Sequence, residues 1–462
     1  MQAPWGSRGS GGATGQLSRR GHGHGECVFG TIVTRSEMRT SIDTPSPRPS
    51  STLRWIAALV WIALIYTTIP FVRVLQTWFT ARWDRALIGH GVVAVLVITA
   101  VTVLVALRRI ASRPPLTTAL WLTVIAAVYA WWAASLRRSP EEAVHLLEYG
   151  VLGVLLYRAL RPRITDATVY VAAALIGLLV GSVDEVIQWI APRRFFDFRD
   201  IFLNSGSCNL ALLAVWRIEG PSSQAVTGRS ILRVVRWSIA VIVLFAVILS
   251  VTPTRVQRWA DRFPKVEFLQ SPDNEMAEYG HRHVLPEIGQ FKSRFTIDQL
   301  RSEDSTRAGE VAAILDRYPD RRYGEFLRDV PPQLDPFAHE ARVHISSRDH
   351  HLRKRTEYPE GSHEARHHAS VALRQHQILE GFFHNTLHSS DYDLPASTVE
   401  RLEREQLPDF LWYSWTSRHL ITWISELALR VTMMITIVAL GALHFVLGSR
   451  TKGAPDKRGA RM

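Results

Sequence analysis

Long apolar runs separated by short polar segments dominate the hydropathy pattern of this chain of 462 residues. A helix that crosses a bilayer needs about 20 apolar residues, because about 30 Å of hydrocarbon is spanned at about 1.5 Å per residue. The runs that meet this length cover residues 53–72, 89–107, 116–134, 143–160, 167–190, 201–218, 231–251 and 431–449. The pattern therefore predicts an all-α membrane protein with about eight transmembrane helices.

One long stretch, residues 253–412, is polar throughout and predicts a soluble domain between the seventh and eighth helices. It holds 12 of the 18 histidines, and Leu300, Val311 and Leu315 recur near helical spacing behind an acidic first turn. We therefore expect a mostly helical domain. Residues 413–430, which contain Tyr413, Trp415 and Trp423, are typical of an interfacial aromatic segment that leads into the last helix.

The charge distribution predicts the topology. The net charge of +12 and the pI near 10.1 come largely from arginines in short loops beside the apolar runs. Counted from Met38 and without residues 253–412, eighteen Lys and Arg lie in the short segments on the side of the N-terminus and eight in the short loops on the opposite side, so both termini are predicted to be cytoplasmic. The charge thus indicates a membrane protein with lipids as partners and no nucleic acid, and helix counting makes residues 253–412 extracytoplasmic.

The two ends of the chain carry no membrane-spanning signal. Residues 1–50 are rich in Gly, Ser, Arg and Pro, which predicts a disordered basic tail, and Met38 is an alternative start. Residues 450–462 form a short basic tail. Cys27 and Cys208 are the only cysteines, so we expect no disulfide framework, and the first helix should act as an uncleaved anchor.

Polar residues within or beside the helices between residues 143 and 218 are the candidate site. Ionisable groups at membrane depth cost about 2.5–3.5 kcal/mol on insertion scales, so they normally face the bundle or a wet cavity. Helical spacing and helix alternation predict that they converge at one end of the bundle. The candidate binding residues are His145, Glu148, Tyr149, Asp184, Glu185, Gln188, Arg193, Arg194, Asp197, Asp200 and Asn204.

The segments "EEAVHLLEYGVLGVLLYRAL" and "GLLVGSVDEVIQWIAPRRFFDFRDIFLNSGS" resemble the VanZ-like family of bacterial membrane proteins. The resemblance covers about residues 55–218, and residues 53–251 would form a seven-helix membrane domain. The matching residues are His145, Tyr149, Asp184, Glu185, Gln188, Pro192, Arg194, Asp200 and Asn204. An Asp-Lys pair usual before the histidine is replaced by Glu141 and Glu142. The resemblance implies a bacterial cell-envelope protein of the inner membrane, with residues 253–412 in the periplasm, of the type linked to resistance to glycopeptides such as teicoplanin.

Three interpretations of the polar residues remain open from the sequence. The cluster could bind a lipid or a lipid-linked cell-wall headgroup, with Arg193 and Arg194 holding an anion. It could be a salt-bridged clasp that fixes the loop. It could also be an enzyme site for phosphate or acyl chemistry on a lipid-linked substrate, with Asp184 or Glu185 as general base or metal ligand and His145 as acid.

The soluble stretch contains one formal metal motif, "HEARH", at His363, Glu364 and His367. Two histidines one helical turn apart with a glutamate base are the pattern of zinc proteases. The motif has Arg366 inside it and lacks apolar flanks, so we expect neither a metal nor another cofactor there. The dense histidine set, which includes His281, His283, His339, His344 and His368, is a looser candidate for a metal or proton response.

Overall fold

The computed structural model describes residues 51–82, 87, 90–91, 94–95, 97, 116–136, 142–191, 194, 196–220, 224–269, 276–417 and 419–452. The predicted tail at 1–50 lies outside the described residues, as do most of the predicted tail at 450–462 and most of the predicted span at 89–107.

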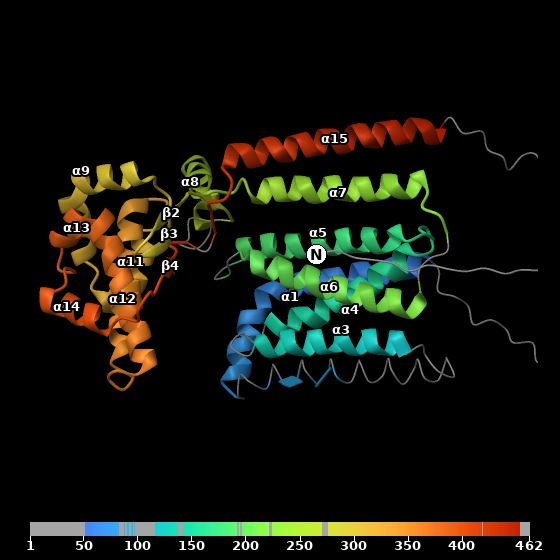
Figure 1. Cartoon of the computed structure of the whole chain (residues 1–462). Helices are drawn as coiled ribbons and strands as arrows, with labels where there is room; N and C mark the ends of the chain where they lie inside the picture. Colours follow the sequence, from blue (N-terminus) through green and yellow to red (C-terminus); the bar gives the residue numbers. More distant parts are fainter. Residues whose placement is uncertain are drawn as a thin grey trace, which may run out of the picture. The chain divides into compact units, whose positions relative to one another are not determined.

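Helices that are long and apolar enough to span a membrane lie side by side in Figure 1, and among the described residues there are seven. They are α1 (Ser51–Thr80), α3 (Leu116–Ser135), α4 (Glu142–Leu160), α5 (Thr168–Ile190), α6 (Phe198–Glu219), α7 (Gly228–Ile248) and α15 (Glu426–Lys452). Each corresponds to a predicted run, which confirms the all-α membrane architecture. The last helix begins at Glu426, a few residues before the apolar run that predicted it.

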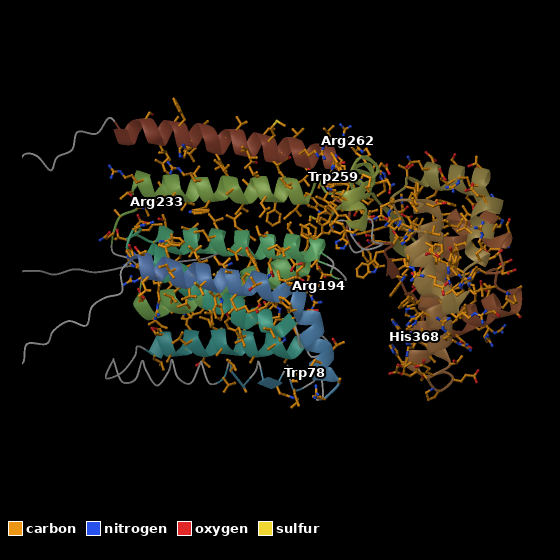
Figure 2. All side chains as sticks on the ribbon, turned by 180° about the vertical axis from the view of Figure 1, so that it is seen from behind. Trp78, Arg194, Arg233, Trp259, Arg262 and His368 are labelled. Atoms are coloured by element: carbon orange, nitrogen blue, oxygen red, sulfur yellow. The ribbon has the colours of Figure 1, made fainter. Side chains whose placement is uncertain are left out.

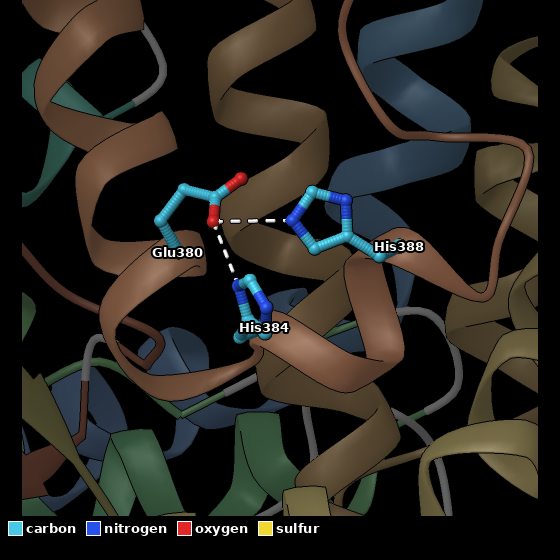
Figure 3. Close-up of side chains that lie close together, drawn as sticks. All are labelled: Glu380, His384 and His388. Carbon is cyan, nitrogen blue, oxygen red and sulfur yellow. Dashed lines mark hydrogen bonds and ion pairs between the residues drawn. The ribbon is translucent and has the colours of Figure 1, made fainter.

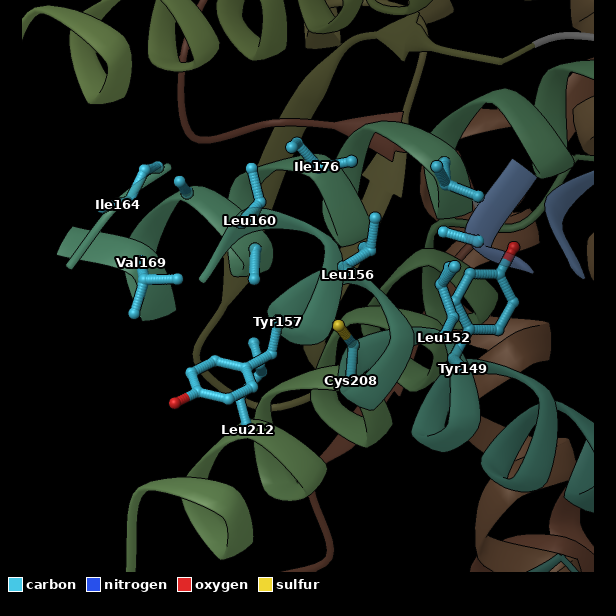
Figure 4. Packing of buried hydrophobic residues seen from close by; sticks show 14 of the residues in the cluster. Tyr149, Leu152, Leu156, Tyr157, Leu160, Ile164, Val169, Ile176, Cys208 and Leu212 are labelled. Atoms are coloured by element: carbon cyan, nitrogen blue, oxygen red, sulfur yellow. The ribbon is translucent and has the colours of Figure 1, made fainter. Parts of the chain in front are cut away.

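Burial in this bundle fits a lipid environment. Leu116 and Phe202 are 84% and 74% exposed, although water would make such exposure of large apolar side chains costly. The protein-facing side is well packed, with Tyr149, Leu152 and Leu156 of α4 fully buried in one cluster (Figure 4). The membrane helices are therefore apolar both on the face that is exposed, where lipid would contact them, and on the face that packs against other helices.

Small residues allow α4, α5 and α6 to approach closely around Cys208, which is fully buried (Figure 4). A Cβ added at Gly177 of α5 would lie 2.5 Å from Cys208 Sγ, and one at Gly153 of α4 would lie 2.8 Å from the Cys208 carbonyl oxygen. Glycine at helix contacts in membranes permits this spacing.

Helices predominate between α7 and α15, as the sequence predicts. They are α8 (Pro253–Arg262), α9 (Ile297–Asp316), α10 (Tyr323–Asp329), α11 (Pro336–Arg355), α12 (His363–Phe382), α13 (His384–His388) and α14 (Ala396–Glu405), with 3-10 turns η1 (Pro264–Leu269) and η2 (Asp320–Arg322). Their core includes Phe291, Phe326 and Phe337, all fully buried.

Two small sheets complete this region, and the hydropathy pattern did not predict them. Strand β1 (Glu278–Tyr279) pairs in parallel with β5 (Leu420–Ile421), while β3 (Gly289–Ser293) lies between antiparallel β2 (His281–Leu285) and parallel β4 (Trp412–Ser414). The start of the predicted interfacial aromatic segment is therefore partly strand, although Trp415 and Trp423 are 60% and 78% exposed. The pairing joins the two ends of the soluble region.

Candidate functional site

The polar residues predicted to converge do lie together, where α4 begins, α5 ends and α6 begins. Asp184 contacts Asn204 across the α5–α6 interface, and Arg199 Nη2 lies 2.8 Å from Glu142 Oε2, which ties α6 to α4. Asp197 forms the N-cap of α6 and accepts a hydrogen bond from the Arg199 backbone N–H. Figure 2 shows Arg194 at this end of the bundle, with Arg233 at the other. Pro192 and Arg193 lie outside the described residues.

Glu185 is a fully buried carboxylate whose two oxygens are both engaged. Oε1 accepts a hydrogen bond of 2.9 Å from Gln188 Nε2, and Oε2 accepts one of 3.1 Å from the Asp197 backbone N–H. The second bond joins the end of α5 to the cap of α6. Glu185 therefore links these two helix ends.

Asp184, the preceding residue, is also fully buried but is bound much less tightly. Its Oδ2 receives two long contacts of 3.4 Å, from Gln188 Nε2 and Asn204 Nδ2. Among the described residues, Asp184 Oδ1 and Asn204 Oδ1 are buried acceptors without a hydrogen-bond partner. Such atoms are rare in folded proteins because leaving them unsatisfied costs about 1–3 kcal/mol each.

Arg194 is half-buried and donates a short hydrogen bond to Gln188 Oε1. No ion pair within 4.0 Å joins it to Asp184 or Glu185 in the described structure. The direct contact of Arg194 is therefore with an amide, and the guanidinium interacts with the Glu185 carboxylate only electrostatically, without an ion pair within 4.0 Å.

The α4 residues form the opposite side of the cluster. His145 Nδ1 lies 3.4 Å from Glu148 Oε2, and the Glu148 carbonyl accepts a hydrogen bond from Trp61 Nε1 of α1. The Tyr149 hydroxyl interacts with the Asp184 carboxylate. Asp200, the remaining predicted acid, interacts electrostatically with His145.

Several supporting residues were not predicted. Tyr66 of α1 donates to the Val180 carbonyl and interacts with Asp184, and Ser207 of α6 donates to the Leu146 carbonyl at 2.6 Å. Tyr129 of α3 donates to the Ser207 carbonyl at 2.6 Å. In the sequence these residues differ from their neighbours only by a polar atom within an apolar run. Tyrosine and serine are common in such runs, so the sequence does not mark them as part of a site.

Some histidines of the soluble region are buried, whereas others are at least partly exposed. Burial lowers the pKa of His339 to about 3 and that of His344 to about 4, so both are neutral near pH 7. The "HEARH" residues stand at the start of α12, where His363 and Glu364 are exposed and His367 packs against Phe410.

A different group has the geometry of a metal site. Glu380, His384 and His388 place one ligand atom each within 4.8 Å of the others, and among the described residues this is the only such group of three or more (Figure 3). "HEARH" is not part of it.

The fold and the site together define a multi-pass membrane protein with buried ionisable groups at one end of its helix bundle. Residues 55–219, which include α1 and α3 to α6, match the family model described as VanZ/LLP1, so this part of the chain is similar to VanZ-like proteins. Helix α7, the soluble region and α15 follow the matched segment. Comparison with curated proteins and with solved structures gave no match.

Proposed function

We propose that this VanZ-like protein resides in the bacterial cell membrane and binds a phosphate-bearing headgroup, of a lipid or a lipid-linked cell-wall intermediate, at the cluster around Asp184. The observation that carries the proposal is the pair of buried acceptors, Asp184 Oδ1 and Asn204 Oδ1, that lack a hydrogen-bond partner among the described residues. Polar atoms at membrane depth are costly and normally serve a polar partner.

The chemistry of the cluster favours a ligand with two kinds of polar group. Buried acceptors at Asp184 and Asn204 suit hydroxyl or ammonium donors. Arg194, whose direct hydrogen bond is to the Gln188 amide, suits a phosphate, because guanidinium binds phosphate oxygens in a planar, bidentate manner. Headgroups of membrane lipids and of lipid-linked cell-wall intermediates carry both kinds of group.

The predicted membrane topology is consistent with this proposal. With both termini in the cytoplasm, the end of the bundle that holds Asp184 and the soluble region would face the outside of the membrane. A protein that engages such headgroups there could alter susceptibility to teicoplanin-type glycopeptides, which is the phenotype that the family resemblance implies.

Two adjacent acids provide a matched test. Asp184→Asn keeps the shape of the side chain and removes a charge that is weakly bonded in the structure, so we expect near-normal abundance and melting temperature. Glu185→Gln replaces an acceptor oxygen of a fully bonded carboxylate with an amide donor, so we expect lower abundance and a lower melting temperature.

The readout is the lipid that copurifies with the protein in mild detergent, identified by mass spectrometry, together with glycopeptide susceptibility of the host. We expect Asp184→Asn and Arg194→Gln to retain less of one headgroup class than the wild type at equal protein amount. If Asp184→Asn instead loses stability in step with phenotype, and a second change at Asn204 restores both, the cluster is a structural clasp and the proposal is wrong.

A further inference from the structure

The soluble region carries a histidine and glutamate group that the membrane site does not use. Glu380 is the last acidic residue of α12, and His384 and His388 are the first and last residues of α13. Phe383, between the two helices, has φ −133° and ψ 28°, so the helix breaks there and α13 turns back toward Glu380 (Figure 3).

The three ligand atoms converge. Glu380 Oε2 lies 2.9 Å from His384 Nδ1 and 3.3 Å from His388 Nε2. A tetrahedral metal with ligand bonds of about 2.1 Å holds its ligand atoms about 3.4 Å apart, so only small side-chain movements are needed to admit one.

Neighbouring residues outside the group contact the His388 and Glu380 side chains and help to orient them. Asp393 Oδ2 lies 2.7 Å from His388 Nδ1, which leaves Nε2 of the same ring facing Glu380. A carboxylate on the far nitrogen of a histidine is the usual outer partner in zinc sites, because it fixes the tautomer and raises the basicity of the ligand nitrogen. On the other side, buried His376 Nε2 lies 3.7 Å from Glu380 Oε1.

The helix that carries both histidines is anchored. The Asp304 carboxylate accepts hydrogen bonds from the backbone N–H groups of Asn385 and Thr386, at 2.9 Å each, and from Thr386 Oγ1 at 2.8 Å. Thr386 and Leu387 are buried, so the opposite face of α13 presents the histidines outward. The ligand positions are thus held by the fold.

We infer that Glu380, His384 and His388 bind a divalent transition-metal ion, with zinc as the probe, in a site that leaves further coordination positions open. Two imidazoles and one carboxylate, without a thiolate, suit Zn²⁺, Co²⁺, Ni²⁺ or Cu²⁺ better than Mg²⁺ or Ca²⁺. The side chains of His384 and His388 are 57% and 42% exposed, so an ion can enter from solvent and water can complete its shell. Three protein ligands with an open position are typical of zinc sites that act on a bound molecule.

The test uses the full-length protein in detergent with a tag that lacks histidine, because the chain has 18 histidines of its own. Zinc binding is measured by competition with a chelating dye, and Co²⁺ is added to read its ligand-field absorbance. We expect His384→Ala and His388→Ala to lower zinc affinity by about tenfold or more and to abolish the Co²⁺ bands. Asp393→Asn, which alters only the support of His388, should lower affinity by about tenfold while leaving weak bands.

His363→Ala combined with His367→Ala is the matched control, because it removes two histidines of the same helix outside the group. Its zinc affinity and Co²⁺ bands should equal those of the wild type. The melting temperature of each variant is first measured without metal. It should equal that of the wild type, because the substituted side chains are exposed or only partly buried. Absence of saturable zinc binding in the wild type, unchanged binding in His384→Ala and His388→Ala, or loss in the control alone would each overturn the inference.

Discussion

The contact around Cys208 makes a quantitative prediction about helix packing. A Cβ at Gly177 would lie 2.5 Å from Cys208 Sγ but 3.4 Å from Cys208 Cβ, which is ordinary contact. Gly177→Ala should therefore be destabilised by overpacking, by about 1–3 kcal/mol, against a helix-propensity gain of up to about 1 kcal/mol. Removing the sulfur in Gly177→Ala/Cys208→Ala removes the clash.

The double variant should recover most of that loss, with a coupling energy of about 1–3 kcal/mol between the two positions. Gly153→Ala should not be rescued, because its Cβ would lie 2.8 Å from the backbone carbonyl oxygen of Cys208, which Cys208→Ala retains. Gly309→Ala on α9, where no atom lies within 4 Å, is the control for helix propensity.

The assay is the fraction of monodisperse protein that remains after heating in detergent, followed by size-exclusion chromatography. A change of 1 kcal/mol corresponds to about 2–4 °C for a domain of this size, so the expected shifts are measurable. Equal rescue of Gly177→Ala and Gly153→Ala by Cys208→Ala, or no rescue of either, would refute the described α4–α5–α6 contact.

Two further predictions concern topology and acid stability. Reporter fusions after residues 110, 160 and 225 should report the cytoplasm, and fusions after 139, 196 and 330 the exported side; a cytoplasmic signal at 330 would reverse the proposed orientation. The pKa of buried His344 is lowered to about 4 in the folded protein, whereas an unfolded histidine titrates near 6.5. Below pH 6.5 the unfolded state therefore binds the extra proton, and stability should fall as the pH drops toward 4, by at most about 3 kcal/mol from this residue. Limited proteolysis across this range should show His344→Gln with a shallower loss than the wild type, and an unchanged slope would contradict the assignment.

The membrane helices and the members of the cluster could be predicted from the sequence because both depend on simple periodicities. A bilayer fixes helix length, and alternating helix direction brings the start of one helix beside the end of the next. The different roles of Asp184 and Glu185 could not be predicted. They are adjacent acids in the same motif, and only the position of Asp197 relative to the end of α5 decides which one meets its backbone N–H.

The aromatic segment shows a second limit. Trp412 and Tyr413 look the same in sequence whether they anchor at an interface or pair in a strand. The pairing of β4 with β3 depends on Gly289, where a Cβ would lie 2.1 Å from the Trp412 carbonyl oxygen. That contact joins residues more than a hundred positions apart, so no local pattern encodes it.

The metal group shows why a motif with correct spacing can mislead. "HEARH" satisfies helical spacing inside an intact helix, yet it stands where the start of α12 leaves His363 and Glu364 in solvent. Glu380, His384 and His388 are spaced by four residues as well, but in a continuous helix Glu380 and His388 would be separated by about 12 Å along the axis, too far for one ion. The break at Phe383 brings their ligand atoms within 4.8 Å of one another. The metal-binding geometry therefore arises from the interruption of the helix, which Asp304 stabilises by capping α13. Residues that reinforce this break, rather than the ligands alone, should decide whether a related chain can bind the ion.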